Sequence, residues 1–157
     1  IDRKYICLTW NSTNLKKGFI KKNVIRSRVN RKKMVVCDEK VGKNALTEYQ
    51  IKRKFDFEKL SICLYECKLH TGRTHQIRVH LSYKGNPILG DKSYGKIKKI
   101  KQIDKNIEKK INAFNRQALH ARTLGFTHPR TGEDILFSAD RPKDLDALIK
   151  NLQKASV

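Results

Sequence analysis

The stretch HTGRTHQIRVHL, residues 70–81, holds three histidines and two arginines within twelve residues. Two imidazoles that converge on one phosphate can act as acid and base near neutral pH, which would suit a nuclease. The histidines His70, His75 and His80 are spaced by five, and this spacing does not guarantee that two of them converge on one phosphate. We therefore expect His75 and His80 to be hydrogen-bonded structural residues beside a strand-to-helix turn.

Zinc binding is a second chemistry to consider, because residues 63–75 contain the spacing C-x3-C-x2-H-x4-H. A zinc finger separates its two ligand pairs by a long segment, and this spacing does not. Cys63 and Cys67 fall on one face of a strand-like stretch, as core residues do, so the sequence predicts no metal site. The cysteines form no CxxC pair and indicate reduced core thiols in a cytoplasmic protein. They are Cys7, Cys37, Cys63 and Cys67.

The strands that must position these residues follow from alternating patterns. Residues 5–10 (YICLTW) and 34–37 (MVVC) are typical of strands. Residues 45–55 and 59–69 alternate between apolar and polar side chains over most of their length, with DFEK at 56–59 as the hairpin connection. Residues 122–140 predict two more strands that turn at PRTG, where Pro and Gly suit a turn.

Helices are predicted at two places and left open at a third. Residues 142–155 predict a closing helix with Pro142 in its first turn. Residues 74–85 fit a strand by alternation and equally fit a helix that ends at Gly85. Residues 96–111 predict a basic helix with a narrow apolar stripe of Ile100, Ile103, Ile107 and Ile111. The fold class is therefore α+β, with a mainly antiparallel mixed sheet and flanking helices.

Charge points to the class of partner. The chain has 36 Lys and Arg residues against 15 Asp and Glu, a formal net charge of +21 and a pI near 10.1. Such a surface favours a polyanion, and nucleic acid is the leading partner because binding neutralises phosphates and releases counterions. At 157 residues and 38% hydrophobic content the chain is expected to be one globular domain. It shows no run of membrane length and no signal peptide, so no membrane partner is expected.

The basic residues cluster between Lys16 and Lys33, where nine cations occur without one acid. We expect this segment to be a basic loop or irregular strand over the surface of the domain. Its expected contacts with the RNA backbone are Arg26, Arg28, Arg31, Lys32 and Lys33. A lysine-rich solvated loop without a role is the alternative, and a lysine-biased proteome would explain part of the excess charge.

Residues 71–95, TGRTHQIRVHLSYKGNPILGDKSYG, resemble the signature of the RluA-type RNA pseudouridine synthases, G-R-[ST]-H-Q-[IL]-R-V-H followed by G-x-P-[IV]-x-G-D-x-x-Y. RKYICLTW, GKNALTEYQI, RQALHA, THPRTGE and PKDLDALI are also similar to family segments, in family order. The resemblance implies a bisected, mainly antiparallel sheet with helices against it, and it favours a helix for residues 74–81. It also implies that uridine in structured RNA, in particular large-subunit ribosomal RNA, is isomerised to pseudouridine.

The same resemblance implies a chemistry without cofactor or metal, in which an Asp carboxylate is obligatory and the target nucleotide is flipped out of its stack. It gives Tyr5 as the aromatic residue on the uracil, Arg78 as the partner that keeps the catalytic Asp ionised, and Leu119 as the apolar residue on the base's other side. Residues expected to bind the substrate are Arg73, Thr74, His75 and Gln76. The alternatives are a core aromatic for Tyr5, a structural ion pair for Arg78 and plain core for Leu119.

The catalytic Asp is expected in an H-R-L-D-x-x-T-S-G motif, and residues 1–157 do not contain it. Asp91 belongs to the signature but not to that position. We therefore expect residues 1–157 to be the C-terminal portion of a synthase catalytic domain, monomeric and inactive alone, with the nucleophile segment and any N-terminal RNA-binding domain outside it. A non-catalytic RNA-binding module with the same fold is the alternative function.

Overall fold

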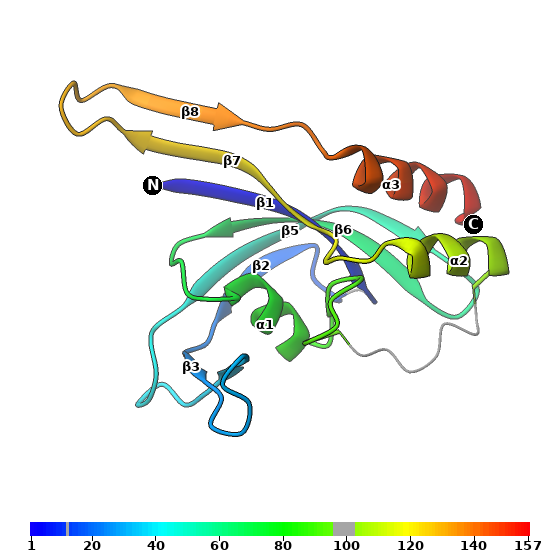
Figure 1. The fold of residues 1–157 in the computed structure, drawn as a ribbon, viewed down its shortest axis with the longest axis horizontal. Helices are drawn as coiled ribbons and strands as arrows, with labels where there is room; N and C mark the ends of the chain where they lie inside the picture. The colour runs from blue at the N-terminus through cyan, green and yellow to red at the C-terminus, as the bar shows by residue number, and fades with distance from the viewer. Residues whose placement is uncertain (12, 96–102) are drawn as a thin grey trace.

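The computed structural model describes residues 1–11, 13–95 and 103–157, which form eight strands and three helices (Figure 1). The α+β class expected from the sequence is confirmed. In chain order the elements are β1 (Asp2–Trp10), β2 (Lys17–Lys21), β3 (Val24–Arg26), β4 (Met34–Val36), β5 (Leu46–Asp56), β6 (Ser61–Leu69), α1 (Gln76–Tyr83), α2 (Lys105–Ala113), β7 (Leu119–Thr127), β8 (Asp134–Ser138) and α3 (Lys143–Ala155).

Six of the strands form one antiparallel sheet in the order β2-β5-β6-β1-β7-β8. The alternating patterns at 45–55 and 59–69 correctly predict β5 and β6 as a hairpin. The first strand of the chain, β1, lies in the middle, where Tyr5 is opposite Cys67 of β6 and Ala121 of β7. A bulge in the β1–β7 ladder falls between Lys4 and Tyr5, and bulges of this kind re-aim the side chains next to them.

The core forms where the sheet meets α2 and α3, which lie side by side (Figure 1). α3 buries Leu145, Leu148, Ile149 and Leu152, an i, i+3, i+4, i+7 stripe that one helical face requires. Its Pro142 stands at the N-cap, one residue before the predicted first turn. No helix in the described ranges is long and apolar enough to cross a membrane.

The helix predicted over residues 96–111 is shorter than expected in the described part. α2 begins at Lys105 because Asp104 caps it, its carboxylate accepting the Asn106 N–H at 2.8 Å. Ile107 and Ile111 are buried on the helix as predicted, and Ile103 is buried just before it. Ile100 and the rest of 96–102 lie outside the described residues.

The segment 16–33 is more ordered than a surface loop. Residues 17–21 form β2, an edge strand of the main sheet that buries Ile20, and residues 24–26 form β3. β3 pairs with β4 in a separate two-stranded sheet. This small sheet packs beside α1 through a second apolar cluster whose buried members are Val24, Ala45 and Val79. The prediction of an irregular basic surface segment therefore holds only between the strands, at 27–33.

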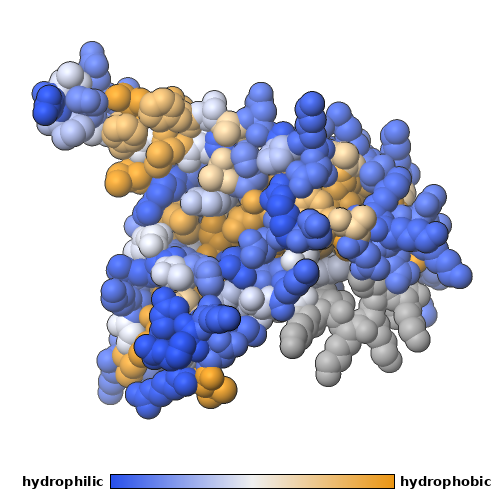
Figure 2. Space-filling view, in the orientation of Figure 1, coloured by the Kyte–Doolittle hydropathy of each residue, from blue (hydrophilic) through white to orange (hydrophobic). Residues whose placement is uncertain are grey.

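The β7–β8 hairpin extends beyond the sheet, since Phe126 and Thr127 of β7 have no partner on β1 (Figure 1). Its turn at residues 128–133 contains the predicted PRTG. Apolar side chains gather on this projection (Figure 2), and the exposed ones are Leu124, Leu136 and Phe137. The hairpin is the most apolar projection that this view shows.

Three of the four cysteines are buried, as the sequence predicts. Cys37 is the exception, because it follows β4 at the rim of the small sheet and is partly exposed. All four are free thiols. Among the described residues no three His, Cys, Asp or Glu side chains lie together in a way that could hold a metal ion.

Candidate active site

Gln76 fixes the loop that leads into α1. Its Oε1 accepts hydrogen bonds from Thr71 Oγ1 at 2.7 Å and from the Arg73 N–H at 3.0 Å. Its Nε2 donates to the carbonyl of Leu46 at 3.1 Å and to Thr47 Oγ1 at 2.9 Å. The side chain is buried and its amide is fully engaged within the protein. Gln76 therefore positions the loop against β5, and direct contact with a substrate stays a prediction.

Arg73 and Thr74 lie on the exposed side of the same loop. Arg73 Nε donates to the carbonyl of Asn44 at 2.9 Å, which holds the arginine across the loop that precedes β5. Both residues line a groove of about 560 Å³ together with Arg26 and Met34 of the small sheet. The groove joins residues predicted to bind the substrate with a residue predicted to bind RNA backbone.

His75 stands at the N-cap of α1 with left-handed backbone, φ 54°. Its Nδ1 is 2.9 Å from the Tyr94 hydroxyl, and the two rings meet edge to face. Burial lowers the pKa of His75, and the positive charge of Arg78 lowers it further. The imidazole is therefore neutral at pH 7 and hydrogen-bonded, as expected of a structural histidine.

Arg78 forms a two-point ion pair with Asp91. Its Nε is 2.8 Å from Oδ2 and its Nη2 is 3.0 Å from Oδ1. The side chains of Arg78 and Asp91 are 12% and 0% exposed. Burial acts to raise the pKa of Asp91, but hydrogen bonds from Arg78 and from the N–H groups of Tyr94 and Ser93 outweigh it, so the pKa lies below its ordinary value.

The remaining guanidinium nitrogen of Arg78, Nη1, has no hydrogen-bond partner among the described residues. An arginine can hold a second carboxylate or a phosphate through such a group. The pairing of Arg78 with a catalytic Asp therefore stays a prediction, and Asp91 is the carboxylate that orients the guanidinium in this structure.

Tyr5 and Leu119 share one face of the sheet. Leu119 is opposite Cys7, and Tyr5 lies two residues before Cys7 on the same strand, so the two side chains are diagonal neighbours. Cβ atoms of diagonal neighbours are about 7 Å apart, close to twice the contact distance of carbon atoms. Both side chains are partly buried against the main core. The register thus allows a flat base between them, while their roles in stacking stay predictions.

Arg3 was not identified from the sequence, and it lies next to the signature loop. It shares a sheet face with Tyr5, two residues away on β1, and its guanidinium packs where a Cβ on Gly72 would be. Its Nε is buried without a hydrogen-bond partner among the described residues. A side chain at Gly72 would therefore displace the Arg3 guanidinium, a contact between distant segments that no local pattern reveals.

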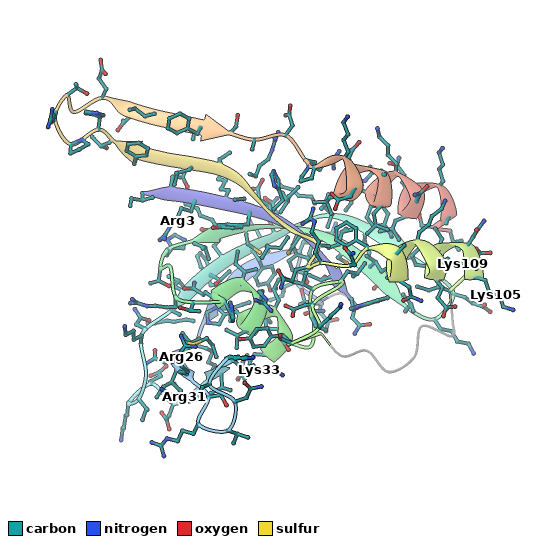
Figure 3. All side chains as sticks on the ribbon, viewed as in Figure 1. Arg3, Arg26, Arg31, Lys33, Lys105 and Lys109 are labelled. Carbon is teal, nitrogen blue, oxygen red and sulfur yellow. The ribbon has the colours of Figure 1, made fainter. Side chains whose placement is uncertain are left out.

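The predicted RNA-contacting cations lie around the small sheet. Arg26, Arg28, Arg31 and Lys32 are exposed, and Lys33 is partly buried. Figure 3 shows Arg26, Arg31 and Lys33 together, at the opposite end of the molecule from Lys105 and Lys109. Arg26 Nη1 donates to the carbonyl of Arg31 at 2.8 Å and so closes the loop. Arg26 is therefore partly structural, which the sequence did not indicate.

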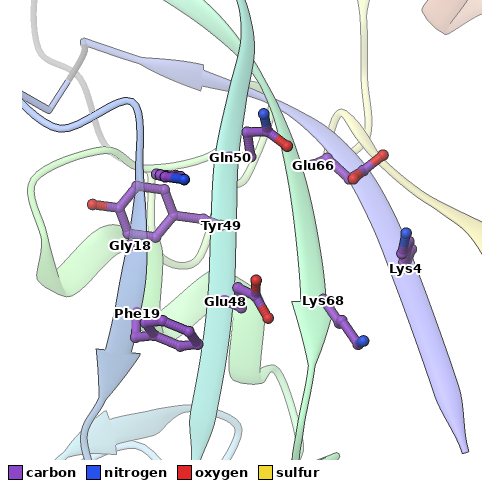
Figure 4. A pocket seen from close by; sticks show the side chains of 9 residues that line it. Lys4, Gly18, Phe19, Glu48, Tyr49, Gln50, Glu66 and Lys68 are labelled. Carbon is purple, nitrogen blue, oxygen red and sulfur yellow. The ribbon is translucent and has the colours of Figure 1, made fainter.

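A larger groove, about 690 Å³, lies on the sheet between β1, β2, β5 and β6 (Figure 4). Residues of both charges line it, among them Lys4, Lys68, Glu48 and Glu66. Two of these charges are compensated by neighbours, since Lys68 pairs with Asp2 and Glu66 with Lys52, and Glu48 is hydrogen-bonded to His70. None of the candidate site residues lines this groove, and its balanced charge does not favour a polyanion. The groove at Arg26 and Arg73 is the better candidate.

His80 behaves as predicted for a structural histidine. It is completely buried, its Nδ1 is 2.8 Å from Thr47 Oγ1 and its Nε2 is 2.9 Å from the carbonyl of Lys22. His70, by contrast, is exposed and bonds Glu48 at 2.8 Å. The three histidines of residues 70–81 thus face three different environments and do not converge.

Comparisons with known proteins agree on one family. Residues 1–83 match the RNA pseudouridylate synthase family. The chain is 41% identical over 154 residues to the uncharacterized RNA pseudouridine synthase YlyB of Bacillus subtilis, covering 98% of this chain and 45% of that protein. It is 40% identical over 152 residues to the ribosomal large subunit pseudouridine synthase D of Zymomonas mobilis, covering 97% and 45%.

The comparison with solved structures finds the same fold in a pseudouridylate synthase domain. Human RNA pseudouridylate synthase domain containing 1 superposes with a TM-score of 0.71 at 22% identity, over 97% of this chain and 65% of that one. The chain spans a little under half the length of the curated relatives it matches. The signature at residues 71–95, the antiparallel sheet and these matches lead to one assignment: the chain belongs to the RNA pseudouridylate synthase family.

Proposed function

We propose that residues 1–157 form the RNA-holding and uracil-binding part of a pseudouridine synthase that acts on large-subunit ribosomal RNA. Family membership supports the reaction class. The name of the Zymomonas mobilis relative, ribosomal large subunit pseudouridine synthase D, supports the RNA class. The formal net charge of +21 supports an RNA partner of any sequence.

In this reaction the C1′–N1 bond of uridine breaks, the uracil turns over and a C1′–C5 bond forms. The C5 proton is lost and N1 gains a proton, so the product is an isomer and no co-reactant is consumed. The target nucleotide must leave its stack, which requires a pocket for the base and cations for the flanking backbone. In the proposal Tyr5 and Leu119 contact the base, and Arg78 holds the catalytic carboxylate ionised through charge.

The observation that carries the proposal is the groove shared by Arg26, Arg73 and Thr74. It lies between the basic small sheet and the signature loop, and Arg78 follows that loop by one helical turn. RNA held at Arg26 would therefore lie beside the signature loop that leads to Arg78.

The proposal assigns the catalytic Asp to residues outside 1–157. Among the acids described here, Asp91 is already saturated by four hydrogen bonds and is wholly buried, which does not suit a nucleophile. The 157-residue chain is then expected to bind RNA and to convert no uridine. The same proposal has the protein work as a monomer in the cytoplasm without a cofactor, and its four free thiols fit a reducing compartment.

The test is pseudouridine formation on transcribed large-subunit ribosomal RNA, measured by nucleoside mass spectrometry after digestion. The whole protein encoded by the gene is compared with the 157-residue chain. We expect conversion by the whole protein and none by the chain. Pseudouridine formed by the chain alone would disprove the assignment of the Asp to another segment.

Arg78 provides the matched variants of the whole protein. Arg78→Ala should keep RNA affinity and lose most turnover, because this side chain serves the carboxylate rather than the phosphates. Arg78→Lys should recover only part, since an ammonium lacks the planar fork. Normal turnover by Arg78→Ala would remove Arg78 from the mechanism. RNA binding without conversion by the whole protein would favour a non-catalytic RNA-binding module instead.

A further inference from the structure

Tyr94 is where the small basic sheet, the start of α1 and the Arg78–Asp91 pair meet. Its hydroxyl oxygen accepts the Met34 N–H of β4 at 2.7 Å and lies 2.9 Å from His75 Nδ1. Its own N–H donates to Asp91 Oδ1 at 3.1 Å. The Arg78 guanidinium carbon is 4.9 Å from the centre of its ring. One side chain thus contacts two elements that are far apart in sequence, β4 and the start of α1.

The hydroxyl and the ring of Tyr94 serve different neighbours. The hydroxyl holds β4, where Met34 is paired with Arg26 of β3, and it holds the imidazole at the N-cap of α1. The hydroxyl can donate its proton to His75 Nδ1, and the neutral imidazole is then protonated at Nε2. The ring supports the Arg78 cation through its π face.

We propose that Tyr94 is a positioning residue. It fixes the position of RNA bound at the small sheet relative to the guanidinium of Arg78. This inference rests on the proposed function and adds to it the device that joins RNA binding to turnover. Through the hydroxyl, β4 and the groove wall at Arg26 and Met34 stay fixed against the signature loop. Through the ring, Tyr94 supports the face of the Arg78 guanidinium, while Asp91 holds the guanidinium by two hydrogen bonds.

The two functions can be separated by two substitutions in the whole protein. Tyr94→Phe keeps the ring and removes the hydroxyl, so it should raise the KM for RNA several-fold and leave kcat near the wild-type value. Tyr94→Leu removes both, so it should also lower kcat, by about two- to thirty-fold for a lost cation–π contact. Tyr83→Phe is the matched control, since Tyr83 is exposed on α1 and its hydroxyl makes no hydrogen bond among the described residues.

A second readout does not depend on activity. Hydrogen exchange measured by mass spectrometry on peptides spanning residues 27–37 should speed up in Tyr94→Phe and stay unchanged in Tyr83→Phe. The reason is that the Met34 N–H loses its acceptor. In NMR spectra of histidine ring nitrogens, His75 should be protonated at Nε2 in the wild type and lose that preference in Tyr94→Phe.

The outcomes separate the two proposals. Unchanged exchange at 27–37 in Tyr94→Phe would overturn the role of Tyr94, whether or not the protein makes pseudouridine. Equal losses of kcat in Tyr94→Phe and Tyr94→Leu with unchanged KM would also overturn it, because that pattern means a smaller folded fraction. Absence of conversion by the wild-type whole protein would instead reject the proposed function, and RNA dissociation constants would then replace KM in the test.

Discussion

At the scale of single residues, the chain contains two Arg–Asp pairs with the same two-point geometry and different burial. Arg78 and Asp91 are 12% and 0% exposed, while Arg116 and Asp144 are 39% and 50% exposed with both contacts at 2.9 Å. Solvent weakens an exposed ion pair, whereas removing one partner of a buried pair leaves the other charge buried and unpaired. The two pairs therefore form a natural comparison.

We expect Asp91→Ala to lower the free energy of unfolding by about 3 to 5 kcal/mol, because it leaves the Arg78 charge buried without its partner. Asp144→Ala should cost less than about 1 kcal/mol. Urea unfolding followed by circular dichroism would measure both. Similar costs for the two variants would mean that water reaches Arg78 easily.

Asp91 also makes the free energy of unfolding depend on pH in the acidic range. Its pKa is lower in the folded than in the unfolded chain, so its contribution is complete above the ordinary value of 3.8 and disappears as the pH falls through the folded value. His80 acts at higher pH. Burial lowers its pKa below 6.5, the bond to the Lys22 carbonyl only partly opposes this, and the unfolded chain therefore takes up a proton first.

Stability should therefore decrease as the pH falls below about 6.5, well before the carboxylates titrate. His80→Gln removes one of the two histidines whose pKa is lowered, so it should reduce the change in free energy of unfolding between pH 7.5 and 5.5, and His75 should retain part of that change. The variant is expected to be less stable at both pH values. Denaturant midpoints at the two pH values give the comparison. A wild-type protein equally stable at both would show that His80 does not set this dependence.

At the scale of elements, the segment 86–91 explains why the signature has glycine at position 90. Its backbone bonds β1, with the Trp10 N–H donating to the Pro87 carbonyl and the Leu89 N–H donating to that of Leu8. Gly90 then turns with φ +75°, and a Cβ there would collide with the backbone carbonyl oxygen of Arg116. Left-handed backbone and close approach both require glycine.

Gly90→Ala should therefore lower the free energy of unfolding by more than the roughly 1 to 2 kcal/mol of left-handed backbone strain alone. Gly85→Ala is the matched control, because Gly85 has φ +81° and nothing within 4 Å of its added Cβ. Thermal or denaturant unfolding of both variants decides the point. Equal losses would mean that the 86–91 segment moves away from Arg116 at little cost.

The elements also show what sequence alone can predict. Alternation identified β5 and β6, since period two is a local property of a half-buried strand. The turn residues PRTG identified β7 and β8. Alternation could not decide residues 74–85, because Ile77 and Leu81 fit a strand and a helix alike. The resemblance to the family correctly favoured a helix for residues 74–81, where α1 forms. Alternation missed β2, where a basic edge strand buries only Ile20.

Contacts of the candidate site between distant segments were not predictable. Met34 meets Tyr94 and Arg3 meets Gly72 only because the sheet folds those segments together. That the loop and α1 form one site stays a prediction. The burial of Gln76 and the hydrogen bond from Arg26 to the Arg31 carbonyl show that these two residues help to hold the structure together.

At the scale of the whole molecule, a net charge of +21 could attract RNA over the entire surface or mainly at the small sheet. Arg28 and Arg31 are exposed there, while Lys105 and Lys109 are exposed at the other end (Figure 3). Each phosphate contact contributes about 0.7 to 0.9 to the slope of log affinity against log salt concentration. Arg26 is left unchanged in the test because it closes the loop.

Changing Arg28 and Arg31 to Ala should lower that slope by about 1.4 to 1.8 and weaken all RNAs alike. Changing Lys105 and Lys109 to Ala removes the same charge and should leave the slope nearly unaltered. Fluorescence anisotropy across a salt series measures it. Equal decreases in both variants would assign RNA binding to the general field of the protein rather than to the small sheet.

The central place of β1 has a consequence for how the chain is made. Lys4 pairs with Lys68 on one side and with Thr123 on the other. During synthesis β1 therefore cannot pair until β6 has been made. Its other edge stays unpaired until β7 leaves the ribosome. Pairings this distant in sequence form slowly, and an open edge invites aggregation. Nascent chains that stop before residue 119 should bind chaperones, and those that include β7 should release them.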